Sequence, residues 1–269
     1  MGIGMAVKAG GSARASSRFS LMLVGLAVLF GAPAQAWAQE PARNTLQCDV
    51  PADQLAAPAP LPHVTAALKD AKKLNILTIG SPVGIGRGLR KSYPAALENL
   101  LERSLTGIDV AIVNRPISGE IVATAVERIH TEVALSRPDL LVWQVGANDA
   151  LARVSPEEFE QDLSEGVRWA KQAGVDVLLV GFEANPWLHD DKEVQAVREA
   201  TSRVAAAENV LYLRRFDAMK FVARTRSRTD QGDELFSPDT GYECMAEQVA
   251  QAVAANLALR HTRPTQAIP

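Results

Sequence analysis

The stretch Leu74–Gly86 (LNILTIGSPVGIG) constrains the fold more than any other part of the sequence. Its first six residues, Leu74–Ile79, are mostly apolar and β-prone, which predicts a strand buried on both faces. The strand is interrupted at Gly80-Ser81-Pro82, and an amphipathic helix is predicted from about Lys91. A strand, a glycine turn and a helix N-terminus is the arrangement with which α/β proteins position a nucleophile or an anion.

From Leu74 onward, apolar segments alternate regularly with amphipathic ones. The predicted strands are Leu74–Ile79, Asp109–Asn114, Leu140–Val145, Val175–Phe182 and Val210–Leu213. The predicted helices cover approximately 91–105, 119–135, 156–173, 191–207, 216–224 and 240–259. This alternation predicts a parallel sheet with helices on both faces. We therefore expect one α/β domain over residues 74–260, a flavodoxin-like three-layer sandwich whose five-stranded parallel sheet has the order 2-1-3-4-5, followed by a tail over 261–269.

The N-terminus has the features of a secretory signal peptide over residues 1–38. Lys8, Arg14 and Arg18 form a positive region, Leu21–Phe30 form an apolar region, and two A-x-A sites end at Ala36 and Ala38. A transmembrane anchor is the alternative, but about a dozen apolar residues are fewer than the roughly 20 that span a bilayer. We expect an exported protein, periplasmic or secreted, that is not an integral membrane protein once processed.

The charge balance argues against one class of partner. The chain has 28 basic and 31 acidic residues, and removal of the leader takes three basic residues and no acidic one, which leaves a net charge of −6. A mildly acidic chain without a basic stripe is not typical of nucleic-acid binding. The expected partners are a small-molecule, glycan or acyl-ester ligand, or another protein.

Residues 39–73 are rich in proline and alanine, so we expect an extended arm without a core of its own and with a short helix from about Val64 to Lys73. The two cysteines, Cys48 and Cys244, lie near opposite ends of the mature chain. In an oxidising compartment they can form a disulfide that joins the arm to the last helix. Two separate buried thiols are the alternative that the sequence leaves open.

Four loops carry the polar residues that are candidates for a functional site, and three of these loops follow the first three predicted strands. In parallel sheets the working surface lies beyond the carboxyl ends of the strands, so these loops are expected to meet. They are Gly80–Gly84, Asn114–Glu120, Val145–Asp149 and, before the last helix, Asp233–Tyr242.

Taken together, these loops resemble the SGNH (GDSL-type) hydrolase family over residues 74 to about 255. The resemblance implies hydrolysis of acyl or acetyl esters by a serine, a histidine and an aspartate, without a metal or another cofactor. It implies that Gly119 and Asn148 match the glycine and asparagine of the oxyanion hole, and that Asp233 matches the aspartate that orients the histidine. Such donors stabilise the oxyanion that develops when serine attacks a carbonyl.

Two positions depart from the family pattern. The motif G-D-S-x-x-x-G, laid on Gly80–Gly86, places Ser81 at its aspartate and Pro82 at its nucleophile. The motif D-x-x-H, laid on Asp233–Phe236, places Phe236 at its base. Proline has neither a hydroxyl nor a backbone N–H, and phenylalanine cannot accept a proton. We therefore expect a degenerate member of the family that binds a ligand or partner and is catalytically inactive.

An active or weak esterase is the alternative interpretation, with Ser81 as nucleophile and a rearranged base. His189 lies in the loop after the fourth predicted strand, which places it on the same side of the sheet with Asp190. A solvated histidine beside a helix N-terminus is the plainer interpretation of that position, and Asp190 and Asp191 are expected to cap the helix rather than to bind a metal.

Overall fold

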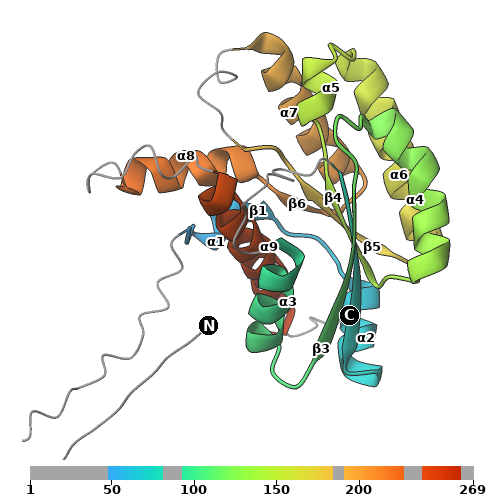
Figure 1. Ribbon diagram of the computed structural model, residues 1–269, viewed down its shortest axis with the longest axis vertical. Helices are drawn as coiled ribbons and strands as arrows, with labels where there is room; N and C mark the ends of the chain where they lie inside the picture. The colour runs from blue at the N-terminus through green and yellow to red at the C-terminus, as the bar shows by residue number, and fades with distance from the viewer. Residues whose placement is uncertain (1–47, 81–92, 184–190, 227–237, 262–269) are drawn as a thin grey trace, which may run out of the picture. The chain divides into compact units, whose positions relative to one another are not determined.

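The computed structural model describes residues 48–80, 93–183, 191–226 and 238–261 (Figure 1). By its contacts the chain separates into Met1–Asn44 and Thr45–Pro269, and all of the described residues belong to the second unit. The proposed signal peptide and the tail after His261 lie outside the described residues. Among the described helices, none combines the length and the hydropathy needed to cross a membrane.

A six-stranded sheet forms the centre of the described unit, in the order β1-β6-β5-β4-β2-β3. All neighbouring strands are parallel except β1, which pairs antiparallel with β6. The predicted order of five parallel strands is confirmed, and the sixth strand is the two-residue β1. The strands are β1 Ala56–Ala57, β2 Lys73–Gly80, β3 Asp109–Pro116, β4 Leu140–Gln144, β5 Asp176–Val180 and β6 Leu211–Leu213.

Two-sided burial explains which strands lie at the centre. Every residue of β5 is buried, and so are the first four of β4, because both strands are covered by helices on each face. In the register, Thr78 of β2 lies beside Val142 of β4, which lies beside Leu178 of β5. The strand β3 is at the edge of the sheet, and only one of its eight residues, Val110, is buried.

Helices cover both faces of the sheet, which confirms the predicted three-layer sandwich. The helices α4, α6 and α7 lie on one face, whereas α3 and α9 pack together on the other (Figure 1). The described helices are α1 Ala52–Leu55, α2 Pro62–Asp70, α3 Tyr93–Ser104, α4 Val122–Ser136, α5 Ala147–Leu151, α6 Pro156–Gln172, α7 Lys192–Ala207, α8 Arg215–Arg226 and α9 Pro238–His261.

Side-chain caps begin two of these helices where the sequence placed them. The Ser155 hydroxyl accepts a hydrogen bond from the Glu158 N–H (3.2 Å) at the start of α6. The Asp191 carboxylate accepts from the N–H groups of Glu193 (3.0 Å) and Val194 (3.3 Å) at the start of α7. Each cap satisfies backbone donors that have no partner within the helix.

The segment 48–73 differs from the extended arm that its composition suggested. Cys48, Val50, Leu55 and Leu61 are each 1% exposed and belong to the same core as the sheet. The Ala59 N–H and carbonyl both bond to the side-chain amide of Asn256 in α9. Proline and alanine dominate the segment, but the apolar residues between them are spaced so that they bury against β6 and α9.

A disulfide joins Cys48 to Cys244, with the two Cα atoms 5.1 Å apart and 196 residues between them in sequence. It connects the start of the described chain to α9, and both cysteines are buried. A cross-link that closes so long a loop lowers the conformational entropy of the unfolded chain. In the chain-entropy model, this raises the free energy of unfolding by roughly 5 kcal/mol.

Replacement of both cysteines by serine should therefore lower the free energy of unfolding. We expect a loss of about 3 kcal/mol and a fall in Tm of about 10 °C, since measured effects are smaller than the entropic limit. Thermal unfolding followed by circular dichroism tests this, and wild-type protein in reductant should match the double variant. Two free thiols titrated in denatured, unreduced wild-type protein would contradict the disulfide.

Asp176 anchors the helix α2 at the start of β5. Its carboxylate is 5% exposed and accepts a hydrogen bond from the Val64 N–H at 2.9 Å. Burial raises the pKa of Asp176 from 3.8 to about 6, and the Val64 hydrogen bond and the nearby His63 oppose this only in part. The native state thus binds this proton more tightly than the unfolded chain does.

The contribution of Asp176 to stability should depend on pH with a definite sign. It is complete below pH 3.8 and is lost as the pH rises through about 6, because a raised pKa favours folding only while the group is protonated. Asp176→Asn keeps an acceptor for Val64 but cannot titrate. Urea denaturation at pH 4.5, 6 and 7.5 should therefore show the Asn variant gaining stability relative to wild type as the pH rises. A constant difference would contradict this assignment, and the exposed Asp53→Asn is the control.

Candidate functional site

The carboxyl ends of β2, β3 and β4 meet at one edge of the sheet, as the sequence predicted. Gly80 ends β2 with a φ of +124°, and a Cβ at this position would collide with the carbonyl oxygen of Gln144 in β4. The Gly80 carbonyl accepts a hydrogen bond from the Ile117 N–H at 3.1 Å. The backbone of β2 is therefore fixed against both neighbouring strands at the residue that precedes Ser81.

Gly119 and Asn148, the two residues that match the oxyanion hole, lie on loops that are bonded to each other. The Asn148 side-chain amide donates a hydrogen bond to the Glu120 carbonyl at 2.8 Å. Gly119 has a φ of +77°, and no atom of the described residues lies within 4 Å of the position that its Cβ would take. The loop after β3 and the helix α5 after β4 thus present a glycine with open space around it beside a half-buried asparagine.

An ion pair between Glu120 and Arg128 holds the loop that carries Gly119. The Glu120 carboxylate is 4% exposed and receives two hydrogen bonds from Arg128 of α4, at 2.8 Å to Oε1 and 2.6 Å to Oε2. Arg128 also donates to the Arg115 carbonyl at 3.0 Å, and the Arg115 side chain pairs with Glu132 at 2.9 Å. Arg115 and Glu120 thus form ion pairs within the protein.

The turn after β4 depends on two residues next to Asn148. Gly146 has a φ of +94°, and a Cβ there would lie 2.9 Å from the Cγ1 of Val197. Asp149 is 2% exposed and accepts a hydrogen bond from the Val122 N–H, at the start of α4, at 2.9 Å. Burial raises the pKa of Asp149, and its hydrogen bonds to backbone N–H groups oppose that increase. The aspartate of this motif therefore connects the loop to α4 and holds Asn148 in place.

The remaining predicted site residues are distributed as follows. Ser81, Pro82, Asp233 and Phe236 lie outside the described residues, and so does His189 with Asp190. His130 stacks on Trp169 between α4 and α6, with the ring centroids 4.0 Å apart. Trp143 and Phe182 are buried core residues.

Sequence reasoning missed a polar cluster at the carboxyl ends of β5 and β6, which we call the Arg215 cluster. It consists of Tyr93, Glu183, Arg215 and Gly241. Arg215 is fully buried; its Nη2 donates to the Gly241 carbonyl at 2.7 Å and pairs with the Glu183 carboxylate at 2.8 Å. An arginine after a short apolar strand gives no sequence signal that distinguishes it from a solvated one.

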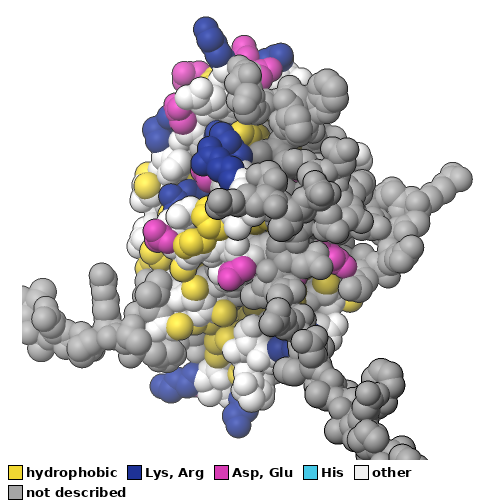
Figure 2. Space-filling view, turned by 90° about the vertical axis from the view of Figure 1, so that its left-hand side faces the viewer, with side chains coloured by type: hydrophobic (Ala, Val, Ile, Leu, Met, Phe, Trp, Pro, Cys, Tyr) yellow, Lys and Arg dark blue, Asp and Glu magenta, His cyan; other side chains and the backbone are white. Residues whose placement is uncertain are grey.

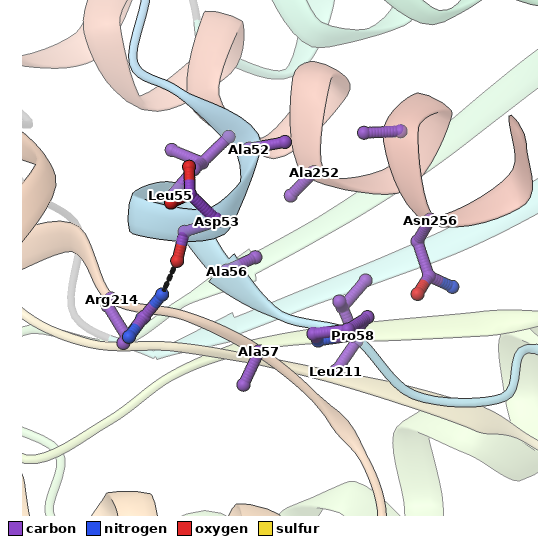
Figure 3. Close-up of a pocket in the computed structure, with 11 residues that line it drawn as sticks. Ala52, Asp53, Leu55, Ala56, Ala57, Pro58, Leu211, Arg214, Ala252 and Asn256 are labelled. Carbon is purple, nitrogen blue, oxygen red and sulfur yellow. Dashed lines mark hydrogen bonds between the residues drawn. The ribbon is translucent and has the colours of Figure 1, made fainter. Parts of the chain in front are cut away.

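A separate hollow of about 620 Å³ lies away from these loops, between the segment 52–58, the end of β6 and α9 (Figure 3). Alanines and leucines make up most of its lining, and Arg214 beside it donates a hydrogen bond to the Asp53 carbonyl. None of its lining residues comes from the loops after β3 and β4. It is therefore a different feature from the predicted site.

The surface agrees with the charge argument. Basic, acidic and apolar side chains are interspersed on the face shown in Figure 2, and the described part of this face has no continuous basic stripe.

Comparison with known proteins finds relatives that are named as esterases. Esterase TesA of Pseudomonas aeruginosa is 29% identical over 142 residues, which are 52% of this chain and 69% of TesA. An arylesterase of Vibrio mimicus is 29% identical over 124 residues, which are 46% of this chain and only 60% of the arylesterase. Among solved structures, a catalytic mutant of an acetylxylan esterase from Geobacillus stearothermophilus superposes with a TM-score of 0.55 at 18% identity, over 67% of this chain and 94% of that one. At that identity, the structural likeness shows the fold alone.

The sequence profile of the non-GDSL lipase-like family matches residues 47–259, which is most of the chain. The match includes the loops that carry Gly119 and Asn148 and reaches from the first cysteine nearly to the end of α9. The chain therefore belongs to the non-GDSL lipase-like family and is a member of the SGNH (GDSL-type) hydrolases, as its loop motifs predicted.

Proposed function

We propose that this protein binds a ligand or a protein partner at the ester-hydrolase edge of the sheet and does not hydrolyse it. The observation that carries the proposal is the contrast between the two halves of the expected site. The loops that carry Gly119 and Asn148 are joined by the hydrogen bond from Asn148 to the Glu120 carbonyl, whereas the nucleophile and base positions are Pro82 and Phe236 in the sequence. The parts that bind are retained and the parts that react are replaced.

The chemistry of the two replacements supports this view. Serine becomes a nucleophile only when an adjacent base takes its proton, so both residues are needed for covalent catalysis. Proline at the nucleophile position also lacks the N–H that would serve as an oxyanion donor. Asp233, which matches the orienting aspartate, has no histidine to orient three residues further on.

The retained donors favour a ligand with a carbonyl or carboxylate oxygen. A primary amide has two N–H bonds, and Asn148 uses one toward the Glu120 carbonyl. The second N–H and the backbone N–H of Gly119 can bind an acyl or acetyl oxygen of a small molecule or glycan. Nucleic acid is not an expected ligand, because the mature chain is acidic.

Export is part of the proposal. The predicted signal peptide over 1–38 and the Cys48–Cys244 disulfide are both consistent with a periplasmic or secreted protein. The proposed domain organisation is a leader over 1–38, an N-terminal segment over 39–73 that joins the core of the domain from Cys48 onward, a hydrolase-like domain over 74–260 and a tail over 261–269.

A weak esterase that uses Ser81 with a rearranged base is the second candidate. It is favoured by the similarity to TesA and to the Vibrio mimicus arylesterase, both of which are named as esterases. Ser81 precedes the nucleophile position by one residue, and neighbouring side chains of an extended chain point to opposite sides, which argues against this candidate.

An esterase assay separates the two candidates. Mature protein on p-nitrophenyl acetate should hydrolyse it at a rate within about twofold of the Ser81→Ala variant, because neither has an activated nucleophile. An active SGNH esterase at equal concentration serves as the positive control. Turnover well above background that Ser81→Ala abolishes would establish the weak esterase instead.

Restoration of the family residues is the complementary test. Pro82→Ser combined with Phe236→His should create ester hydrolysis that a serine-directed phosphonate inhibits, provided that the family register is correct. Adding Asn148→Ala should then reduce the restored rate by roughly 100-fold, as expected for an oxyanion donor. A correctly folded but silent double variant would show that the register, or the cleft, is not that of the family.

A further inference from the structure

The buried guanidinium of Arg215 has more hydrogen-bond donors than there are acceptors around it in the described residues. Its Nη2 is engaged by Gly241 and Glu183. Its Nε and Nη1 are buried and have no hydrogen-bond partner in the part of the chain that the structure describes. A guanidinium has one N–H at Nε and two at Nη1, so three N–H bonds of a permanent cation lack an acceptor.

The hydroxyl of Tyr93 is a second buried donor in the same cluster. It too has no hydrogen-bond partner among the described residues. Burial raises the pKa of Tyr93 and the positive charge of Arg215 opposes that increase, which places the two side chains within electrostatic reach of each other. The phenol therefore stays protonated at physiological pH and remains a donor.

The cluster is assembled from four separate elements. Tyr93 begins α3, Glu183 follows β5, Arg215 begins α8, and Gly241 lies in the first turn of α9. Glu183 and Arg215 follow the carboxyl ends of their strands, and this is the same edge of the sheet at which Gly119 and Asn148 lie. The Glu183 side chain is 30% exposed and is thus the part of the cluster that contacts solvent.

Buried donors without acceptors are rare, and donors on a charged group are the most costly to leave unsatisfied. One half-buried carboxylate and one carbonyl do not match a guanidinium and a phenol. An oxyanion supplies several acceptor lone pairs and a negative charge at once, whereas a neutral carbonyl supplies only the former.

We propose that the Arg215 cluster binds a carboxylate or phosphate group, with Arg215 Nε and Nη1 and the Tyr93 hydroxyl as donors. The proposal gives the chemical class of the ligand that binds at this edge of the sheet. It rests on the proposed function only in assuming that a ligand binds at this edge. Glu183 holds Arg215 in place from the solvent side, and its negative charge sets the limit on how strongly a second anion binds.

Side-chain NMR gives a direct test on the full mature protein. The Nε–H resonance of Arg215, assigned by its loss in Arg215→Lys, is followed while sodium acetate or sodium phosphate replaces sodium chloride at constant ionic strength. We expect a saturable shift with one of the two probes, and the stronger probe identifies a carboxylate or a phosphate ligand. Unchanged spectra with both would overturn the proposal, because the donors are then satisfied by water or within the chain.

Tyr93→Phe provides the matched variant, since it removes one hydroxyl and no volume from the core. It should weaken anion binding by about tenfold, the usual effect of one hydrogen bond to a charged group. Tyr212→Phe, at a buried tyrosine of β6, should leave the affinity unchanged. Equal affinities in wild type and Tyr93→Phe would place the ion elsewhere and refute the site.

This result is independent of the hydrolysis experiments. Anion binding without turnover supports both proposals, whereas anion binding in a protein that hydrolyses p-nitrophenyl acetate supports the cluster and refutes the inactive site. Absence of anion binding refutes the proposed anion site. The proposed function is then decided by the esterase assay that compares wild type with Ser81→Ala.

Discussion

Burial of β4 and β5 on both faces is the constraint on which the rest of the structure depends. A parallel strand buried on both sides has no polar face, so its chain can change direction and contact solvent only at its ends. The ends of β2, β3 and β4 are fixed to one another by backbone contacts such as Gly80 to Ile117. The loops that follow must therefore meet at one edge, whatever residues they carry.

The residues that hold these loops in place are different from those at the nucleophile and base positions of the family motifs. Gly80 and Gly146 are required by backbone geometry, since a Cβ at either position would contact a neighbouring strand or helix. Asp149 and Glu120 hold the loops through buried hydrogen bonds. None of these four residues takes part in attack on a carbonyl. None of these contacts involves position 82 or position 236.

The fold, and the meeting of the loops after β3 and β4, could be predicted because both follow from local patterns. The apolar run Val175–Phe182 predicted a central strand, and the helix predicted from residue 156 begins there. Gly119 and Asn148 were located by motif, and the loops that carry them are bonded to each other. The strand β1 was missed because two alanines give no pattern. Arg215 was missed because burial of a charge depends on Glu183 and Gly241, which are distant in sequence.

The described part of this edge of the sheet presents several hydrogen-bond donors. The amide of Asn148 and the guanidinium of Arg215 both favour an oxygen that carries negative charge, fully or in part. In an ester hydrolase such donors stabilise a transient oxyanion, and their value is greatest in the transition state. Where no nucleophile generates that state, the same donors stabilise whatever stable oxyanion resembles it. A carboxylate, a product of ester hydrolysis, matches the negative charge of that state, and a phosphate matches both its charge and its tetrahedral geometry.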